Sequence, residues 1–283
     1  MTDVLKKIVQ ENDFKNGDSV VSVNNFGLIV NHAVETNKID TTIDQSGTLD
    51  SRFDDIGYYL GGGLGSSGGE TPVGGTPVYE SISTLSYGGY SSSSFVVDKP
   101  AGTSENDLLL FTALQNTASS ITPPSGVSEI TTGGSSRKWG VWSKIAGDSE
   151  PSTYAFGTGG GRMAIACLRF SSVDTSNPVP VFDTSGTPAG QVSNWDCPDV
   201  TSTVTDSIAV RVLFEYDDTG ATAHSGITEL FSNGNNSAAD TRLAVGYDND
   251  TYASGESCGI KGWTSTGYAE WYQAATLMIA GGS

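Results

Sequence analysis

Residues 138–145 read KWGVWSKI, and residues 207–214 read SIAVRVLF. Apolar residues alternate with small or polar ones in both stretches, which is the period of two typical of a β-strand. Trp139 and Trp142 are an odd number of residues apart, so a regular strand cannot bury both on one face, and we expect one of them in the core. These two stretches indicate that the fold is built from β-strands.

Further short stretches of the same character follow throughout the second part of the chain, separated by Gly, Ser, Asn and Pro turns. The other candidate strands are 79–87, 93–97, 108–114, 153–156, 162–170, 227–231, 242–246 and 268–279. About ten short strands with polar turns predict a mainly β fold, an antiparallel β-sandwich with jelly-roll-like topology. No strict short repeat is visible, which argues against a solenoid or a propeller.

Residues 61–77 read GGGLGSSGGETPVGGTP. Stretches of this composition do not form a core and instead connect folded parts. The chain is therefore predicted to have an N-terminal segment over 1–60, a linker over 61–77 and a β-sandwich domain over 78–283.

The N-terminal segment is predicted to be partly helical, over 2–11, 26–38 and 49–60. Short amphipathic helices are marginal alone, so their apolar stripes need a partner. We expect docking onto other proteins or oligomerisation through Phe26, Ile29, Val30, Phe53 and Ile56. The alternative is a small independent helical subdomain.

The net charge of the chain is −18. Residues 1–64 hold five Lys or Arg against ten Asp or Glu, and residues 65–283 hold nine against twenty-two, so both parts are acidic. Acidic surfaces repel nucleic-acid backbones and anionic membranes, and neither is expected as a partner. We find no signal-peptide pattern and no apolar run near the roughly 20 residues of a membrane helix.

The three cysteines, Cys167, Cys197 and Cys258, are widely spaced. This count predicts neither a disulfide framework nor a zinc site, and it suits a protein made in a reducing cytoplasm. Cys167 lies in an apolar run and is expected to be a buried thiol. A bridge between Cys197 and Cys258 stays open as an alternative.

No catalytic motif is visible, so we predict no enzyme activity, no cofactor and no metal. The two histidines, His32 and His224, lie outside any nucleophile motif, and two histidines make a zinc site improbable. The acidic clusters are Glu215 with Asp217 and Asp218, and Asp248 with Asp250. We interpret them as solvated turn residues, with a shared calcium ion as the alternative.

Aromatic residues on loops could stack on sugar rings. Trp195 and Trp263 both lie in turn-like surroundings and are the candidates for a glycan-binding site. The alternative for each is packing against a loop or a neighbouring subunit.

Four stretches of the β-domain resemble a sandwich module of bacteriophage virion proteins, both tail-fibre and capsid-associated. They are 100–110, 122–126, 142–156 and 168–178. The chain departs from this pattern at Val127, where the family usually has an aromatic residue. The resemblance implies a phage particle as the setting and carries no catalytic residues.

Together these features predict a phage virion structural protein, made in the host cytoplasm and released by lysis. The N-terminal segment would dock onto other virion proteins, of the capsid or the tail, and the sandwich would be displayed as a capsid decoration or head fibre, as a homo-oligomer with a trimer favoured. The short linker favours this over a tail-fibre tip. The alternative is a tail-fibre receptor-binding module that recognises a host cell-surface glycan through Trp195 and Trp263.

Overall fold

The computed structural model describes residues 75–86, 93–187, 192–215, 220–233, 241–269 and 271–282, together with the residue pairs 18–19 and 33–34. The chain separates into two compact units, Met1–Glu70 and Thr71–Ser283. The boundary falls inside the glycine-rich stretch 61–77.

In the first unit, β1 (Asp18–Ser19) pairs antiparallel with β2 (Ala33–Val34). The two-residue strand β2 lies within the stretch 26–38, which was predicted to be helical. The five residues predicted to form the docking or oligomer interface, Phe26, Ile29, Val30, Phe53 and Ile56, lie outside the described residues.

The second unit contains a first five-stranded antiparallel sheet with the strand order β3-β9-β5-β7-β6. Its central strands are apolar because both of their faces are covered, and all eight residues of β5 are buried. The bounds are β3 Val78–Leu85, β5 Leu108–Gln115, β6 Ser128–Gly133, β7 Lys138–Ile145 and β9 Met163–Ser171.

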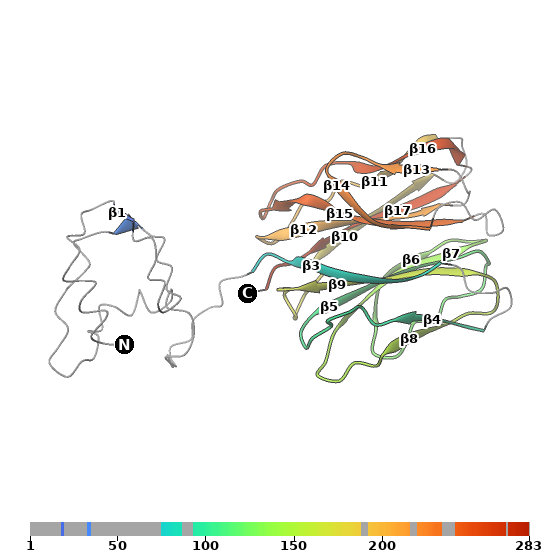
Figure 1. Cartoon of the computed structure of the whole chain (residues 1–283). Helices are drawn as coiled ribbons and strands as arrows, with labels where there is room; N and C mark the ends of the chain where they lie inside the picture. Colours follow the sequence, from blue (N-terminus) through green and yellow to red (C-terminus); the bar gives the residue numbers. More distant parts are fainter. Residues whose placement is uncertain are drawn as a thin grey trace. The chain divides into compact units, whose positions relative to one another are not determined.

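A second five-stranded antiparallel sheet has the order β10-β17-β12-β15-β14. The bounds are β10 Val181–Thr187, β12 Ser207–Glu215, β14 Ile227–Ser232, β15 Arg242–Tyr252 and β17 Tyr272–Ile279. The two sheets pack face to face around one apolar core, to which both contribute (Figure 1). Leu110 and Phe170 come from the first sheet, and Val212 and Leu277 come from the second.

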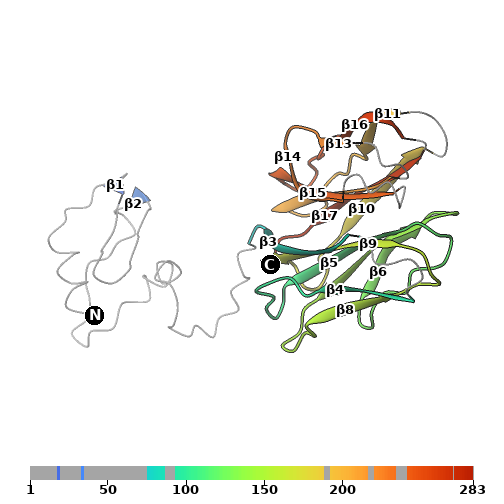
Figure 2. The ribbon, with the colours of Figure 1, turned by 45° about the vertical axis from the view of Figure 1, so that its right-hand side comes forward.

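A smaller sheet covers the outer face of each large one, so the second unit has four layers (Figures 1 and 2). The pair β4 (Ser94–Asp98) and β8 (Thr153–Gly157) lies beside the first sheet. The three strands β11 (Val192–Cys197), β16 (Lys261–Ala269) and β13 (Ala221–Ala223) lie beside the second.

Each outer layer closes over its own apolar core, so the large sheets are buried on both faces. The two tryptophans of β7 show the consequence. Trp139 belongs to the central core and Trp142 to the core under β4 and β8, and both are buried. The prediction that they point to opposite faces is confirmed, but the expectation of only one in the core is wrong because a second layer covers the other face.

The antiparallel β fold is confirmed, and no helix occurs among the residues that the structure describes. Two five-stranded sheets pack face to face, and the small outer sheets add a layer on each side that the sequence did not predict. Gly75 and Gly282, near the two ends of the second unit, lie beside each other, and Val173, in its middle, lies beside Gly281. Isolated bridges join Gly75 to Gly282 and Val173 to Gly281.

Candidate functional site

A charged pair lies in the interior of the second half of this unit. All nine residues of β12 are buried, and its side chains alternate between two apolar layers. Val210 and Val212 face the central core. Arg211 points the other way, toward the three-stranded outer sheet, where it meets Asp248 of β15, and neither side chain has any exposed surface. A buried ion pair is costly unless other groups complete its hydrogen bonds, and buried charges are frequent at functional sites.

The guanidinium of Arg211 finds partners for its donors inside the protein. Its Nε lies 3.2 Å from Oδ1 of Asp248 and its Nη2 lies 2.7 Å from Oδ2, which is the two-point geometry that arginine makes with a carboxylate. Its Nη1 donates to the hydroxyl of Thr276 at 3.0 Å. The remaining bonds go to the carbonyl oxygens of Pro198, Cys258 and Gly259. Arg211 therefore joins strands β15 and β17 of the large sheet to the loops that follow β11 and precede β16.

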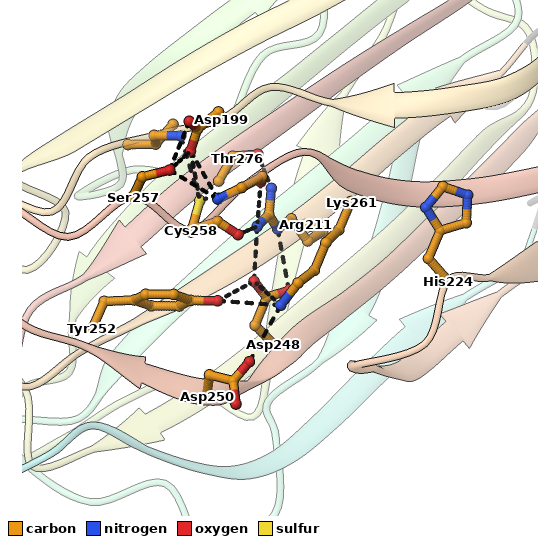
Figure 3. A network of polar contacts seen from close by, with 12 residues as sticks. Asp199, Arg211, His224, Asp248, Asp250, Tyr252, Ser257, Cys258, Lys261 and Thr276 are labelled. Carbon is orange, nitrogen blue, oxygen red and sulfur yellow. Dashed lines mark hydrogen bonds and ion pairs between the residues drawn. The ribbon is translucent and has the colours of Figure 1, made fainter.

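Two further donors reach the carboxylate of Asp248 from different sides (Figure 3). The hydroxyl of Tyr252 donates to Oδ2 at 2.7 Å, and Nζ of Lys261 lies 3.2 Å from the same oxygen. Nζ of Lys261 also lies 3.4 Å from Oδ2 of Asp250, whose side chain is 69% exposed. Four donors of the chain itself therefore reach this carboxylate, one at Oδ1 and three at Oδ2.

The protonation states follow from these contacts. Burial raises the pKa of Tyr252, and the hydrogen bond to Asp248 raises it further, so this phenol keeps its proton. Burial alone would lower the pKa of Arg211, but the carboxylate of Asp248 outweighs burial and the pKa is raised. The network is thus a closed arrangement of fixed charges and donors, suited to holding strands together and unsuited to proton transfer.

A second carboxylate, Asp199, fastens the loop that precedes β16. It accepts hydrogen bonds from the hydroxyl of Ser257 at 2.6 Å and from the backbone N–H of Gly259 at 2.8 Å (Figure 3). Gly259 has a φ of 67°, in the left-handed region that favours glycine. This contact places the carbonyl oxygen of Gly259 where Arg211 bonds to it.

The three cysteines of the chain are inert thiols, two of them near the network and Cys167 in the core of the first half. Cys167, Cys197 and Cys258 are all free and buried, so the predicted burial of Cys167 is confirmed and no bridge joins the other two. Burial raises the pKa of Cys197 to about 12, although Arg211 acts in the opposite direction. Burial likewise raises the pKa of Cys258. A thiol that keeps its proton is a poor nucleophile.

The first half of the unit has a smaller cluster of the same chemistry. Glu150 accepts bonds from Nζ of Lys144 at 2.7 Å, from the hydroxyl of Tyr154 at 2.6 Å and from the backbone N–H of Gly147 at 2.8 Å. Burial acts to raise the pKa of Glu150, but these donors outweigh burial and the pKa is lowered. Burial and the bond to Glu150 raise the pKa of Tyr154. Here too, lysine and tyrosine close around one carboxylate.

The predicted glycan-binding tryptophans are wrong as surface residues. Trp195 lies in β11 and Trp263 in β16, where they are paired across the two strands, and neither has any exposed surface. Their indoles form the core under the outer sheet, and Nε1 of Trp263 donates to Glu229 at 2.7 Å. A sugar cannot stack on a ring whose faces are both covered by protein.

The acidic residues divide differently from the prediction. Glu215 and Asp248 are buried within strands, so their interpretation as solvated turn residues is wrong. Asp250 is exposed, as expected. Asp217 and Asp218 lie outside the described residues. The ring of His224 is half-buried beside β13, and its Nδ1 accepts the backbone N–H of Gly262 at 3.1 Å.

Sequence reasoning missed Arg211, which it treated as the polar member of an alternating strand. The signal was present: both neighbours on the same face, Ala209 and Leu213, are apolar. In the described part of the chain, no cluster of three or more His, Cys, Asp or Glu side chains could hold a metal ion. Among the same residues, no helix meets the length and hydropathy of a membrane span. Comparison of the chain with protein-family models, curated proteins and solved structures finds no match.

Proposed function

We propose that this chain is a structural protein of a bacteriophage particle. Its N-terminal segment docks onto other virion proteins, and its β-unit is displayed on the surface as a capsid decoration or head fibre. The observation that carries the proposal is the bonding of two carboxylates, Asp248 and Glu150, each of which is surrounded by donors of the chain itself. Arg211 binds Asp248 and three backbone carbonyl oxygens, and Glu150 binds Lys144 and one backbone N–H, as expected for a unit whose work is to be rigid and stable.

Two other features support a displayed unit. The boundary between the two compact units falls within a glycine-rich stretch, which suits a tether. The net charge of −18 keeps neighbouring copies apart when many are displayed on one particle. The resemblance of roughly residues 92–178 to virion sandwich modules supplies the setting.

Incorporation into particles tests the proposal. The full chain and a chain lacking residues 1–60 are produced in infected cells, and purified particles are assayed for each. We expect the full chain in particles and the shortened chain only in the soluble fraction, with an unchanged β-sheet circular dichroism spectrum. Incorporation of the shortened chain would contradict the docking role of the N-terminal segment.

A matched pair of substitutions sharpens this test. Ile29→Asp places a charge on the predicted apolar stripe, whereas Asn31→Asp places the same charge on the other side of the same predicted helix. We expect loss of incorporation for the first and normal incorporation for the second. Equal incorporation of both variants would rule out the stripe as the docking surface.

The location of the chain on the particle separates the two candidate roles. Imaging of particles that carry a label on this chain distinguishes head from tail. A tail position, together with specific binding on a glycan array, would favour a receptor-binding module. Such binding would have to use residues other than Trp195 and Trp263, because both are buried.

A further inference from the structure

The two large sheets of the second unit are built in the same order. The first half runs from β3 to β9 and the second from β10 to β17. If the strands of each half are numbered from its first strand and β13 is left out, the order in both large sheets is first, seventh, third, fifth, fourth. The second and sixth strands form the outer layer in each half, β4 with β8 and β11 with β16. Strand β13 is the one addition to the second half among the strands described. Such agreement in strand order is the mark of a repeated module.

Backbone conformation repeats at the same spacing. Asn106 and Asp206 are 100 residues apart, lie one or two residues before the third strand of their half, and have φ values of 70° and 56°. Positive φ is uncommon outside glycine, so its recurrence at matching places is informative. Gly126 and Gly226 precede the fourth strands and have φ values of 77° and 86°, again 100 residues apart.

A short stretch of sequence repeats with them. Residues 125–130 read SGVSEI and residues 225–230 read SGITEL. Both stretches enter the fourth strand of their half, and the pairing with the fifth strand shifts register at the same step, at Ile130 and at Leu230. A bulge is a specific local feature, so the shared position supports a common origin of the two halves.

The outer layers match as well. Phe95 pairs with Phe156 across β4 and β8, and Trp195 pairs with Trp263 across β11 and β16. All four rings point into the core beneath their outer sheet. The buried tryptophans are therefore the second-half versions of an aromatic pair that the first half also carries.

Equivalent faces of the two halves meet each other. Leu110 and its equivalent Val210 both line the central core. Phe111 and its equivalent Arg211 both point away from it, toward their outer sheets. When the same face of two like modules is in contact, the interface is isologous, as in a twofold symmetric dimer.

The contacts across the interface agree with a twofold axis. Trp139 stacks on Phe214 with 4.8 Å between ring centres. Leu114 lies beside Trp139 in the first sheet, and Leu243 lies beside Phe214 in the second. Leu114 is equivalent to Phe214, and Leu243 is equivalent to Trp139. A twofold rotation that exchanges the two halves therefore places Leu243 and Leu114 where Trp139 and Phe214 stack. Strand β15, which carries Leu243, packs against β5, which carries Leu114.

We propose that residues 75–282 are a fused dimer: two copies of one seven-stranded module, joined through an isologous interface between the inner faces of their large sheets. The partner that this face fits is a second copy of the module. The proposal does not depend on the function proposed above.

The aromatic stack can be moved to test the symmetry in the intact chain. A double variant, Trp139→Leu with Phe214→Leu, removes the stack, and the equilibrium constant of unfolding should rise about 100-fold or more. A quadruple variant adds Leu114→Phe and Leu243→Trp, which rebuilds the stack at the symmetry-related place. We expect it to recover at least about tenfold of this loss.

The result that overturns the proposal is a quadruple variant no more stable than the double variant, or one that fails to fold, because two extra rings then overpack the core. A control adds the same two rings to the double variant at inner-face positions unrelated by the symmetry, as Leu110→Phe and Val245→Trp. This control should be less stable than the double variant.

A second measurement does not depend on repacking. A protease site inserted in the full chain between Thr175 and Ser176, both exposed, allows the folded protein to be cut between its halves. The two pieces should stay together in size-exclusion chromatography. Leu110→Ala, on the inner face, should weaken their association about 30-fold or more, whereas its neighbour Leu109→Ala, equally buried on the outer face, should not. Pieces that separate unaided, or equal effects of both variants, would refute a module–module interface.

Discussion

The most informative perturbation is Asp248→Asn, which removes one charge from the buried network and hardly changes its shape. Arg211 has no exposed surface, so without the carboxylate of Asp248 its positive charge stays in the interior with only neutral hydrogen-bond partners. A second positive charge, that of Lys261, lies nearby. Removal of one partner from a buried ion pair typically costs about 3–5 kcal/mol. For a domain of this size, 1 kcal/mol corresponds to about 2–4 °C in Tm, so we expect a fall of about 6–20 °C.

The matched control is Asp250→Asn, because the chemical change, the strand and the contact with Lys261 are the same. The side chain of Asp250 is 69% exposed, so its ion pair with Lys261 is screened by water. Exposed pairs of this kind contribute about 0–1 kcal/mol. Urea unfolding of both variants, followed by circular dichroism, gives the two free energies of unfolding. A difference below about 1 kcal/mol between them would refute the view that the network is a buried stabilising element.

Trp195→Phe and Trp263→Phe should each destabilise the fold, in thermal unfolding, by less than the corresponding alanine variants, for which about 3–5 kcal/mol is expected. The reason is that phenylalanine fills the matching positions of the first half, and equal losses of stability for Phe and Ala variants would contradict the equivalence. Glu150→Gln should lower stability near pH 7 but not in acid. The lowered pKa means that the folded state favours the carboxylate, so the stabilisation is present above the ordinary pKa of about 4.5 and is lost as the pH falls through the lower folded value. Unfolding curves of wild type and variant that stay apart at pH 2 would disprove this assignment. Gly126→Ala and Gly226→Ala should each destabilise by about 1–2 kcal/mol, since alanine resists a positive φ, and a loss at only one site would argue against matching turns.

Much of the fold is readable from the sequence where strands alternate or are wholly apolar. The strand β7 begins and ends where its alternation predicts, and β5 exceeds its prediction by one residue. Five strands, β6, β10, β11, β13 and β16, were missed wholly or for most of their length, and most of them are rich in Ser, Thr, Asn, Asp or Gly. Strands β6 and β10 lie at the edges of the large sheets, where few neighbours demand apolar side chains.

The candidate site was harder to predict because its signals look alike on a surface and in a core. Trp195 is flanked by Asn194 and Asp196, which resembles a loop, yet Trp195 and Cys197 share one face of the strand and are both buried. The partnership of Arg211 with Asp248 joins residues 37 positions apart, and no local pattern announces such a contact. The duplication escaped notice because aliphatic residues exchange freely within a core, which leaves only short stretches recognisable.

The meeting of Gly75 with Gly282 has a practical consequence for labelling and engineering. A fluorescent protein or peptide fused at the carboxyl end emerges beside Gly75, so it reports the position of the end of the unit at which the chain enters. The turn over 158–161 precedes β9, whose other end, Ser171, pairs with Val78 at the start of the unit. An epitope inserted in that turn would mark the opposite pole, and joining the two ends would give a circularly permuted unit with new termini there.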